Sequence, residues 1–104
     1  MEIRYDDSYE SLGAEYQYQL VGLLDKALKK VSLPTAQRRE VCEQFLFDMA
    51  MLHDQGVIQA DDVTVSPALC FASGEILHTP NKEFELHDYA FGNVSEYFDS
   101  TETS

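Results

Sequence analysis

The sequence predicts an α+β domain in which a two-helix antiparallel hairpin packs on a small, about three-stranded antiparallel β-meander. Three observations lead to this prediction. Apolar residues recur at helical spacing through the first half of the chain, and Pro34 divides that half into two segments. After Gly56 the helical period stops, and β-branched residues and turn sequences replace it. With 104 residues, 44% of them hydrophobic, residues 1–104 can form a single domain with its own core.

The first helix is expected over about residues 8–31. Asp7 and Glu10 have the spacing of a capping box, whose side chains bind the free amides of a first helical turn. Asp25 and Lys29 have the spacing of an intrahelical ion pair. Apolar residues at intervals of three and four predict one buried face. These residues are Tyr9, Leu12, Tyr16, Leu20, Leu23, Ala27 and Val31, with Val21, Leu24 and Leu28 on the adjoining positions.

The second helix is expected over residues 34–55. Pro34 suits a first helical turn, and Gly56 supplies the left-handed residue that commonly ends a helix. The segment Phe45–Leu52 is apolar on nearly every side, which is typical of a helix that is buried all round. It would lie either between the first helix and the sheet or in a homodimer interface.

Residues 63–89 are expected to form the β-meander, and residues 57–62 a connection. A first strand starts at Val63 and runs to about Ala72, with Pro67 imposing an edge position, a bulge or a break. A helix over residues 66–72 is the alternative.

The rest of the meander follows from turn sequences. Ser73–Gly74 predicts a hairpin turn, residues 75–79 the returning strand, and residues 83–87 a third strand with alternating polarity. A short helix or extended segment is expected over residues 93–98, and a disordered tail over residues 100–104.

A cytoplasmic location is expected from the amino terminus and the cysteines. The first residues have neither the basic start nor the apolar stretch of a secretory signal, and no segment is apolar over the length of a membrane span. Cys42 and Cys70 lie in apolar surroundings, so we expect buried, reduced thiols.

The charge distribution is the least ordinary feature of the sequence. The formal net charge is -12, and all of this excess lies in residues 40–104, which contain thirteen acidic residues and one basic residue. Such a segment attracts a cationic partner and rejects anionic ones, so it argues for a basic protein partner and against direct contact with nucleic acid or an anionic membrane. The alternative is that the charge serves only solubility.

The partner-binding residues are expected on the outer face of the meander. On the predicted third strand, Glu83 and Glu85 would point to the same side, about 7 Å apart, and Tyr89 would add contact area beside them. The complete predicted surface consists of Asp61, Asp62, Glu75, Glu83, Glu85, Asp88 and Tyr89.

The sequence contains no motif that fixes a catalytic or metal site. His78, His87 and Asp88 are the one ligand set that adjacent strands would bring together, but no spacing of the His-Glu-x-x-His or Cys-x-x-Cys kind supports it. We therefore predict no catalytic residue, no metal and no cofactor.

Two functions from different classes remain. The first is a non-enzymatic module that binds a basic protein and inhibits or neutralises it, in the manner of immunity proteins, antitoxins or phage anti-defence inhibitors. The second is a homodimeric domain that binds a small ligand or has weak enzymatic activity, with Phe45–Leu52 at the dimer interface and His78 or His87 in a pocket.

Overall fold

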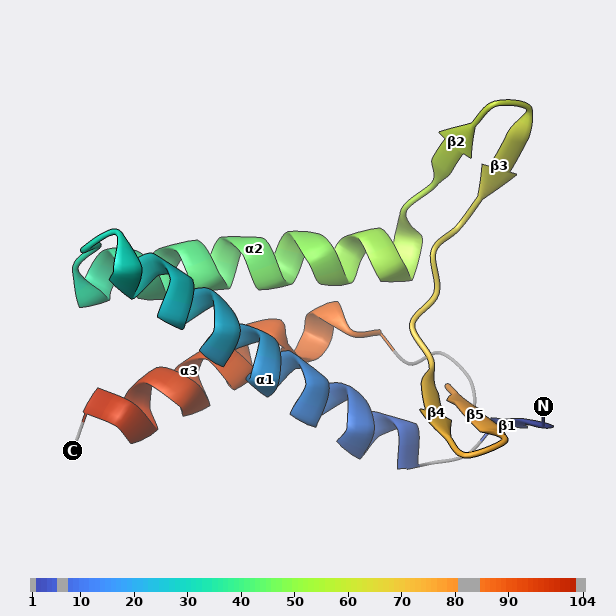
Figure 1. Cartoon of the computed structure of the whole chain (residues 1–104), viewed down its shortest axis with the longest axis horizontal. Coiled ribbons are helices and arrows are strands. Elements are labelled where there is room, and N and C mark those ends of the chain that lie inside the picture. The colour runs from blue at the N-terminus through green and yellow to red at the C-terminus, as the bar shows by residue number, and fades with distance from the viewer. Residues whose placement is uncertain (1, 6–7, 81–84, 103–104) are drawn as a thin grey trace.

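The described residues fold as three helices that pack together, with short strands at one end (Figure 1). The helices are α1 (Ser8–Lys30), α2 (Thr35–Gln55) and α3 (His87–Glu102). This structure is a computed structural model, and the residues that it describes are 2–5, 8–80 and 85–102. The α+β fold class is confirmed, and so are two long helices close to the predicted ranges.

The turn between α1 and α2 is closed by backbone hydrogen bonds around Ser32. This residue has φ 63°, the left-handed conformation that usually requires glycine. The amide of Leu33 donates to the carbonyl of Leu28 at 3.2 Å, and the amide of Ser32 donates to that of Lys29 at 3.0 Å. This pair of bonds is the Schellman motif, and it turns the chain back within a few residues.

Gly56 follows α2 as predicted, but it is not left-handed. Its φ of -73° and ψ of 157° are extended. A glycine fits this position for a different reason, because a Cβ here would lie 2.5 Å from the carbonyl oxygen of Leu52. Close approach of the backbone, and not the sign of φ, favours glycine at this helix end.

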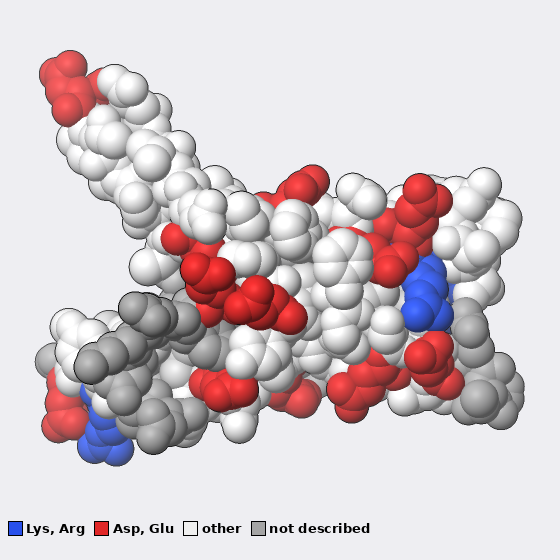
Figure 2. Space-filling view, turned by 180° about the vertical axis from the view of Figure 1, so that it is seen from behind, with Lys and Arg blue, Asp and Glu red and all other residues white. Residues whose placement is uncertain are grey.

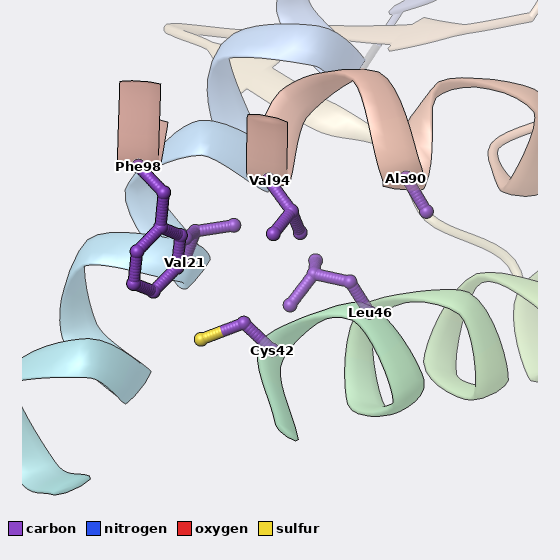
Figure 3. Packing of buried hydrophobic residues seen from close by; sticks show 6 residues of the cluster. All are labelled: Val21, Cys42, Leu46, Ala90, Val94 and Phe98. Atoms are coloured by element: carbon purple, nitrogen blue, oxygen red, sulfur yellow. The ribbon is translucent and has the colours of Figure 1, made fainter. Parts of the chain in front are cut away.

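The main core lies between the three helices (Figure 3). The helical hairpin packs on the sheet as predicted, but only at one end, in a second cluster of Tyr9, Ala50 and Leu86 against which Leu69 and Phe71 pack. The main core contact of the helical hairpin is with α3, which was not predicted. The spacing of four between the three α3 residues of this core gives that helix one apolar face. The buried side chains are Val21 from α1, Cys42 and Leu46 from α2, and Ala90, Val94 and Phe98 from α3.

The buried face of α1 differs from the predicted apolar stripe. Leu23 and Val31 are 64% and 72% exposed. The residues that α1 buries are Tyr9, Gly13, Gln17, Val21 and Asp25, of which Tyr9 and Val21 are predicted. Periodicity of apolar residues misses the other three, because Gln17 and Asp25 are polar and Gly13 has no side chain.

Both buried polar side chains of α1 are hydrogen-bonded. Gln17 donates from Nε2 to the carbonyl of Leu86 at 2.9 Å, and its Oε1 accepts from Asn93 Nδ2 at 2.7 Å. Asp25 accepts from Arg38 Nε at 2.6 Å and from the Tyr97 hydroxyl at 3.0 Å. Such pairing is what makes the burial of polar groups tolerable.

The predicted ion pair between Asp25 and Lys29 is present, with a separation of 3.3 Å. Burial by itself would raise the pKa of Asp25, but the hydrogen bonds from Arg38 and Tyr97 and the charge of Lys29 hold this pKa below its usual value. The carboxylate therefore stays charged inside the helical layer.

The strands form two separate sheets. In the three-stranded sheet β5 (Ile76–Thr79) is central, with β1 (Glu2–Tyr5) parallel on one side and β4 (Phe71–Ser73) antiparallel on the other. The second sheet is a hairpin of β2 (Ile58–Ala60) and β3 (Val63–Val65). Figure 1 shows this hairpin projecting away from the helical layer, beyond the end of α2.

The predicted meander is correct only at its middle. The returning strand is present, and Gly74 with φ 60° lies in the turn before it. The strand that starts at Val63 ends at Val65, and residues 66–70 form neither a helix nor a strand. Residues 57–62 are not a simple connection, because they contain β2. The third strand of the sheet is β1, which pairs with β5. No turn sequence predicts this pairing, because the two strands are far apart in the chain.

The carboxy-terminal part of the prediction also changes. Residues 85–87 are not a strand, and the rest of the predicted strand over 83–87 lies outside the described residues. The segment 93–98 is helical, which confirms the first of its two predicted alternatives, but α3 is longer and continues through residues 100–102, where a disordered tail was expected. Residues 103 and 104 lie outside the described residues.

The second half of α2 is not buried on all sides. Leu46 and Ala50 are buried, whereas Phe45 is 49% and Leu52 is 42% exposed. Among the described residues, no helix has both the length and the apolar character needed to cross a bilayer.

Candidate protein-binding surface

The β2–β3 hairpin exposes every residue of its two strands. Because the strands are antiparallel and side chains alternate, directly paired residues lie on the same face. Gln59 pairs with Thr64, and these two residues form a polar face. The two flanking pairs form the opposite, wholly apolar face. They are Ile58 with Val65, and Ala60 with Val63.

This apolar face is not covered by the rest of the described chain. Ile58 is 41%, Val63 57% and Val65 47% exposed, and Val57 at the base of the hairpin is 63% exposed. Single exposed apolar side chains are ordinary, but a contiguous set on one face is typical of an interaction site.

Two aspartates form the tip of the hairpin. Asp61 and Asp62 connect the strands, and Asp61 has φ 54°, a left-handed conformation that aspartate adopts more readily than most residues. Figure 2 shows acidic residues, in red, at the end of the projecting hairpin. The hairpin therefore combines an uncovered apolar face with an anionic tip.

The predicted partner-binding residues lie in three places. Asp61 and Asp62 are at the hairpin tip, and Glu75 is exposed in the turn between β4 and β5. Glu85, Asp88 and Tyr89 are at the start of α3, and Glu83 lies outside the described residues. In Figure 1 the hairpin tip and the β4–β5 turn are at opposite corners of the strand end of the molecule.

The described members therefore do not form one continuous face. The prediction assumed one meander over residues 63–89, with Asp61 and Asp62 directly before it, but residues 85–89 are the approach to α3 and its first turn. Tyr89 is only partly exposed, and its hydroxyl donates to Glu10 at 2.6 Å.

Asp54 joins the end of α2 to the start of α3. Its carboxylate accepts from the amides of Leu86 at 3.0 Å and His87 at 2.9 Å, and Oδ2 lies 2.7 Å from His87 Nδ1. With a side chain only 6% exposed, Asp54 caps the first turn of α3 and orients the imidazole of His87. No local pattern indicates this contact, because Asp54 and His87 are 33 residues apart in the sequence.

Three side chains at this helix start could hold a divalent cation. His87 Nε2 lies 3.2 Å from Glu85 and 3.5 Å from Asp88, and the ligand atoms of the three residues lie within 4.8 Å of one another. Glu85 thus takes the place that His78 has in the predicted ligand set. Both acids are exposed, and the same contacts also suit a protonated imidazole, so they assign no metal.

The pKa of His87 is raised, first by its hydrogen bond to Asp54 and further by the charges of Asp88 and Glu85. We expect the His87 titration, followed by NMR, to have a midpoint above about 6.5 and to move down in Asp54→Asn. Because the folded-state pKa of His87 is raised, protonated His87 stabilises the folded state. This stabilisation is complete below about pH 6.5 and is lost as pH rises through the folded-state pKa of His87. Asp48→Asn, which changes an exposed acid of α2, is the control. An unchanged midpoint in Asp54→Asn would contradict this assignment.

A cavity of about 220 Å³ lies beside Asp54. The Tyr9 hydroxyl in its wall donates to the carbonyl of Leu69 at 2.6 Å, and burial raises the pKa of Tyr9 to about 12. Nδ1 of His53 is buried and has no hydrogen-bond partner among the described residues. Neither His78 nor His87 lines this cavity, so it does not match the pocket of the ligand-binding hypothesis. The lining residues are Tyr9, His53, Asp54, Ala68, Leu69, Pro80 and Leu86.

The two cysteines differ. Cys42 is buried as predicted, and burial raises its pKa to about 11, so its thiol stays protonated. Cys70 is exposed, and its predicted burial is wrong because residues 66–70 do not enter a sheet. Neither cysteine forms a disulfide in the described chain.

Many of the basic side chains are paired with carboxylates of the same chain. Arg4, Lys29, Arg38 and Arg39 each lie 3.3 Å or less from a carboxylate. Figure 2 shows red atoms from the hairpin tip across the body of this face, with few blue atoms among them. Among the residues whose exposure the structure describes, the exposed acids of the carboxy-terminal part are Glu40, Asp48, Asp61, Asp62, Glu75, Glu85, Asp88, Glu96 and Asp99.

Comparison of the chain with family models, with curated proteins and with solved structures found no match.

Proposed function

We propose that this protein is a small, cytoplasmic, non-enzymatic interaction module that binds a basic protein and inhibits or neutralises it, as immunity proteins and anti-defence inhibitors do. The observation that carries this proposal is the exposed acidic surface. Residues 40–104 hold thirteen acids and one base, and the arginines that could offset them nearby are already engaged.

Charge of one sign over a surface raises the rate of encounter with a partner of the opposite sign. Arg38 is paired with buried Asp25, and Arg39 lies 3.1 Å from Asp99. Most of the exposed acids therefore remain available to a cationic partner. The same field disfavours nucleic acid and anionic membranes, which carry phosphate charges of the same sign.

The test is capture from a lysate of the source cells with the immobilised protein at low and at high salt. We expect a basic protein that is retained at low salt and released at high salt, because screening weakens attraction between exposed charges. With that protein purified, stopped-flow mixing should show association that slows about tenfold or more between 50 and 500 mM salt.

Two double variants are compared. Glu40→Lys with Asp48→Lys reverses the charge of two exposed acids of α2, and Lys26→Glu with Lys30→Glu reverses the charge of two exposed lysines of α1. The first pair should slow association and the second should not. If no basic protein binds, the proposed function is wrong. A dimer in light scattering that is lost in Phe45→Ser would then favour the homodimeric domain.

A further inference from the structure

We infer that the β2–β3 hairpin is the element that docks into the basic partner, with its apolar face seated in an apolar groove and its anionic tip against cations at the groove rim. This inference rests on the proposed function and names the part of the surface that does the binding. Three features of the hairpin carry it.

The first feature is that the hairpin is not part of the core. Neither hydrophobic cluster includes a residue of β2 or β3, and all six strand residues are exposed. A two-stranded hairpin without a covered face is only marginally stable in water. Packing within the described chain therefore does not explain why this segment carries β-branched residues.

The second feature is the segregation of its side chains. Ile58, Val63 and Val65 lie on one face, with Ala60 as the small residue between them, while Gln59 and Thr64 lie on the other. A hairpin that served only as a connection would have no need of this separation. One apolar and one polar face are what an element needs when it lies in a groove with one side against a partner and the other in water.

The third feature is the charge of the tip, which indicates what kind of partner covers the apolar face. Asp61 and Asp62 are at the tip, so whatever covers the apolar face must also accept two carboxylates. An anionic membrane surface would repel them. A second copy of the chain would bring its own aspartates and its own net charge of -12. A basic protein satisfies both the apolar and the anionic part of the hairpin.

The hairpin is also placed to reach a groove. It extends beyond the end of α2, away from α1 and α3 (Figure 1). Its apolar face and tip can therefore enter a concave surface without contact between the partner and the helical core. The acids of the body would then contribute through long-range attraction, and the hairpin through contact.

The test begins with a photo-activated crosslinker, p-benzoylphenylalanine, placed either at Ala60 on the apolar face or at Thr64 on the polar face. In the lysate of the source cells, irradiation should join the Ala60 derivative, and not the Thr64 derivative, to a basic protein. That protein is then purified, and its affinity for the hairpin variants is measured.

Val63→Thr with Val65→Thr keeps the β-branched shape and replaces two methyl groups by hydroxyls. We expect about 100-fold weaker binding, mostly from faster dissociation, with the salt dependence retained. Asp61→Asn with Asp62→Asn keeps size and tolerates the left-handed conformation. It should slow association about tenfold at low salt and reduce the salt dependence. Gln59→Ser with Thr64→Ser is the matched control on the polar face and should change binding less than twofold.

The outcomes separate the inference from the proposed function. If the basic partner binds all hairpin variants as it binds the original protein, while Glu40→Lys with Asp48→Lys weakens binding, the function stands and the hairpin inference is wrong. If no basic protein binds, both are wrong. A homodimer that Val63→Thr with Val65→Thr dissociates would show that a second copy covers the face, which also overturns the inference. Thermal unfolding of each variant at an unchanged midpoint excludes misfolding as the cause.

Discussion

Replacing Arg38 with alanine is expected to lower the free energy of unfolding by about 3–5 kcal/mol, the usual cost of removing one partner of a buried ion pair. The Asp25 side chain is 3% exposed and accepts from Arg38 Nε at 2.6 Å. Arg38 also donates to the carbonyl of Leu33 at 2.7 Å, so it supports the turn between α1 and α2. Urea unfolding at neutral pH measures the effect.

Arg39→Ala is the matched control for this change. The neighbouring arginine contacts Asp99, which is 67% exposed, so its loss should cost about 1 kcal/mol or less. Equal effects of the two substitutions would contradict the assignment of Asp25 and Arg38 as a buried pair.

The difference between the original protein and Arg38→Ala should depend on pH. Because the pKa of Asp25 is lowered in the folded state, its stabilising contribution is present above the unfolded-state pKa of about 3.9 and is lost as pH falls through the folded-state pKa. Without Arg38, burial favours the protonated carboxyl. The two proteins should therefore differ most near neutral pH and less below about pH 4.

Replacing Phe98 with alanine is expected to lower the free energy of unfolding by about 3–5 kcal/mol. Phe98 is 1% exposed and belongs to the core cluster with Val21 and Val94 (Figure 3). Removal of the ring loses its transfer free energy and leaves a cavity between α1 and α3. Urea unfolding followed by circular dichroism measures the loss.

Phe91→Ala on the same helix provides the comparison. Phe91 is 46% exposed and contacts Phe47 at a ring-centroid distance of 5.5 Å. Its removal should cost roughly 1 kcal/mol, because nearly half of the residue is already in water. A larger loss for Phe91→Ala than for Phe98→Ala would mean that α3 presents a different face to the core.

The long helices could be predicted from the sequence because their signals are local. Helical periodicity and Pro34 locate α1 and α2 to within a residue or two at each end. The buried face of α1 could not be predicted in this way. Gln17 and Asp25 are buried because Asn93 and Arg38 reach them from distant parts of the chain.

Strand pairing and the contact surface depend on the same kind of distant information. The strand signals near Gly74 correctly gave a hairpin, but nothing local indicates that β1 pairs with β5. The acidic residues were identifiable one by one, whereas their grouping depended on a third strand that residues 85–87 do not form. The alternation from Ile58 to Val65 was a readable signal of the projecting hairpin, and the interpretation of residues 57–62 as a connection obscured it.

The parallel pairing of β1 with β5 also has a consequence for synthesis of the chain. Residues 2–5 leave the ribosome well before their partner, which spans residues 76–79, so the three-stranded sheet cannot close until residue 79 has been made. Both long helices are complete before that point. Sheet closure is therefore a late event that must bring together strands more than 70 residues apart. The loss of chain entropy in closing so long a loop makes this step slow.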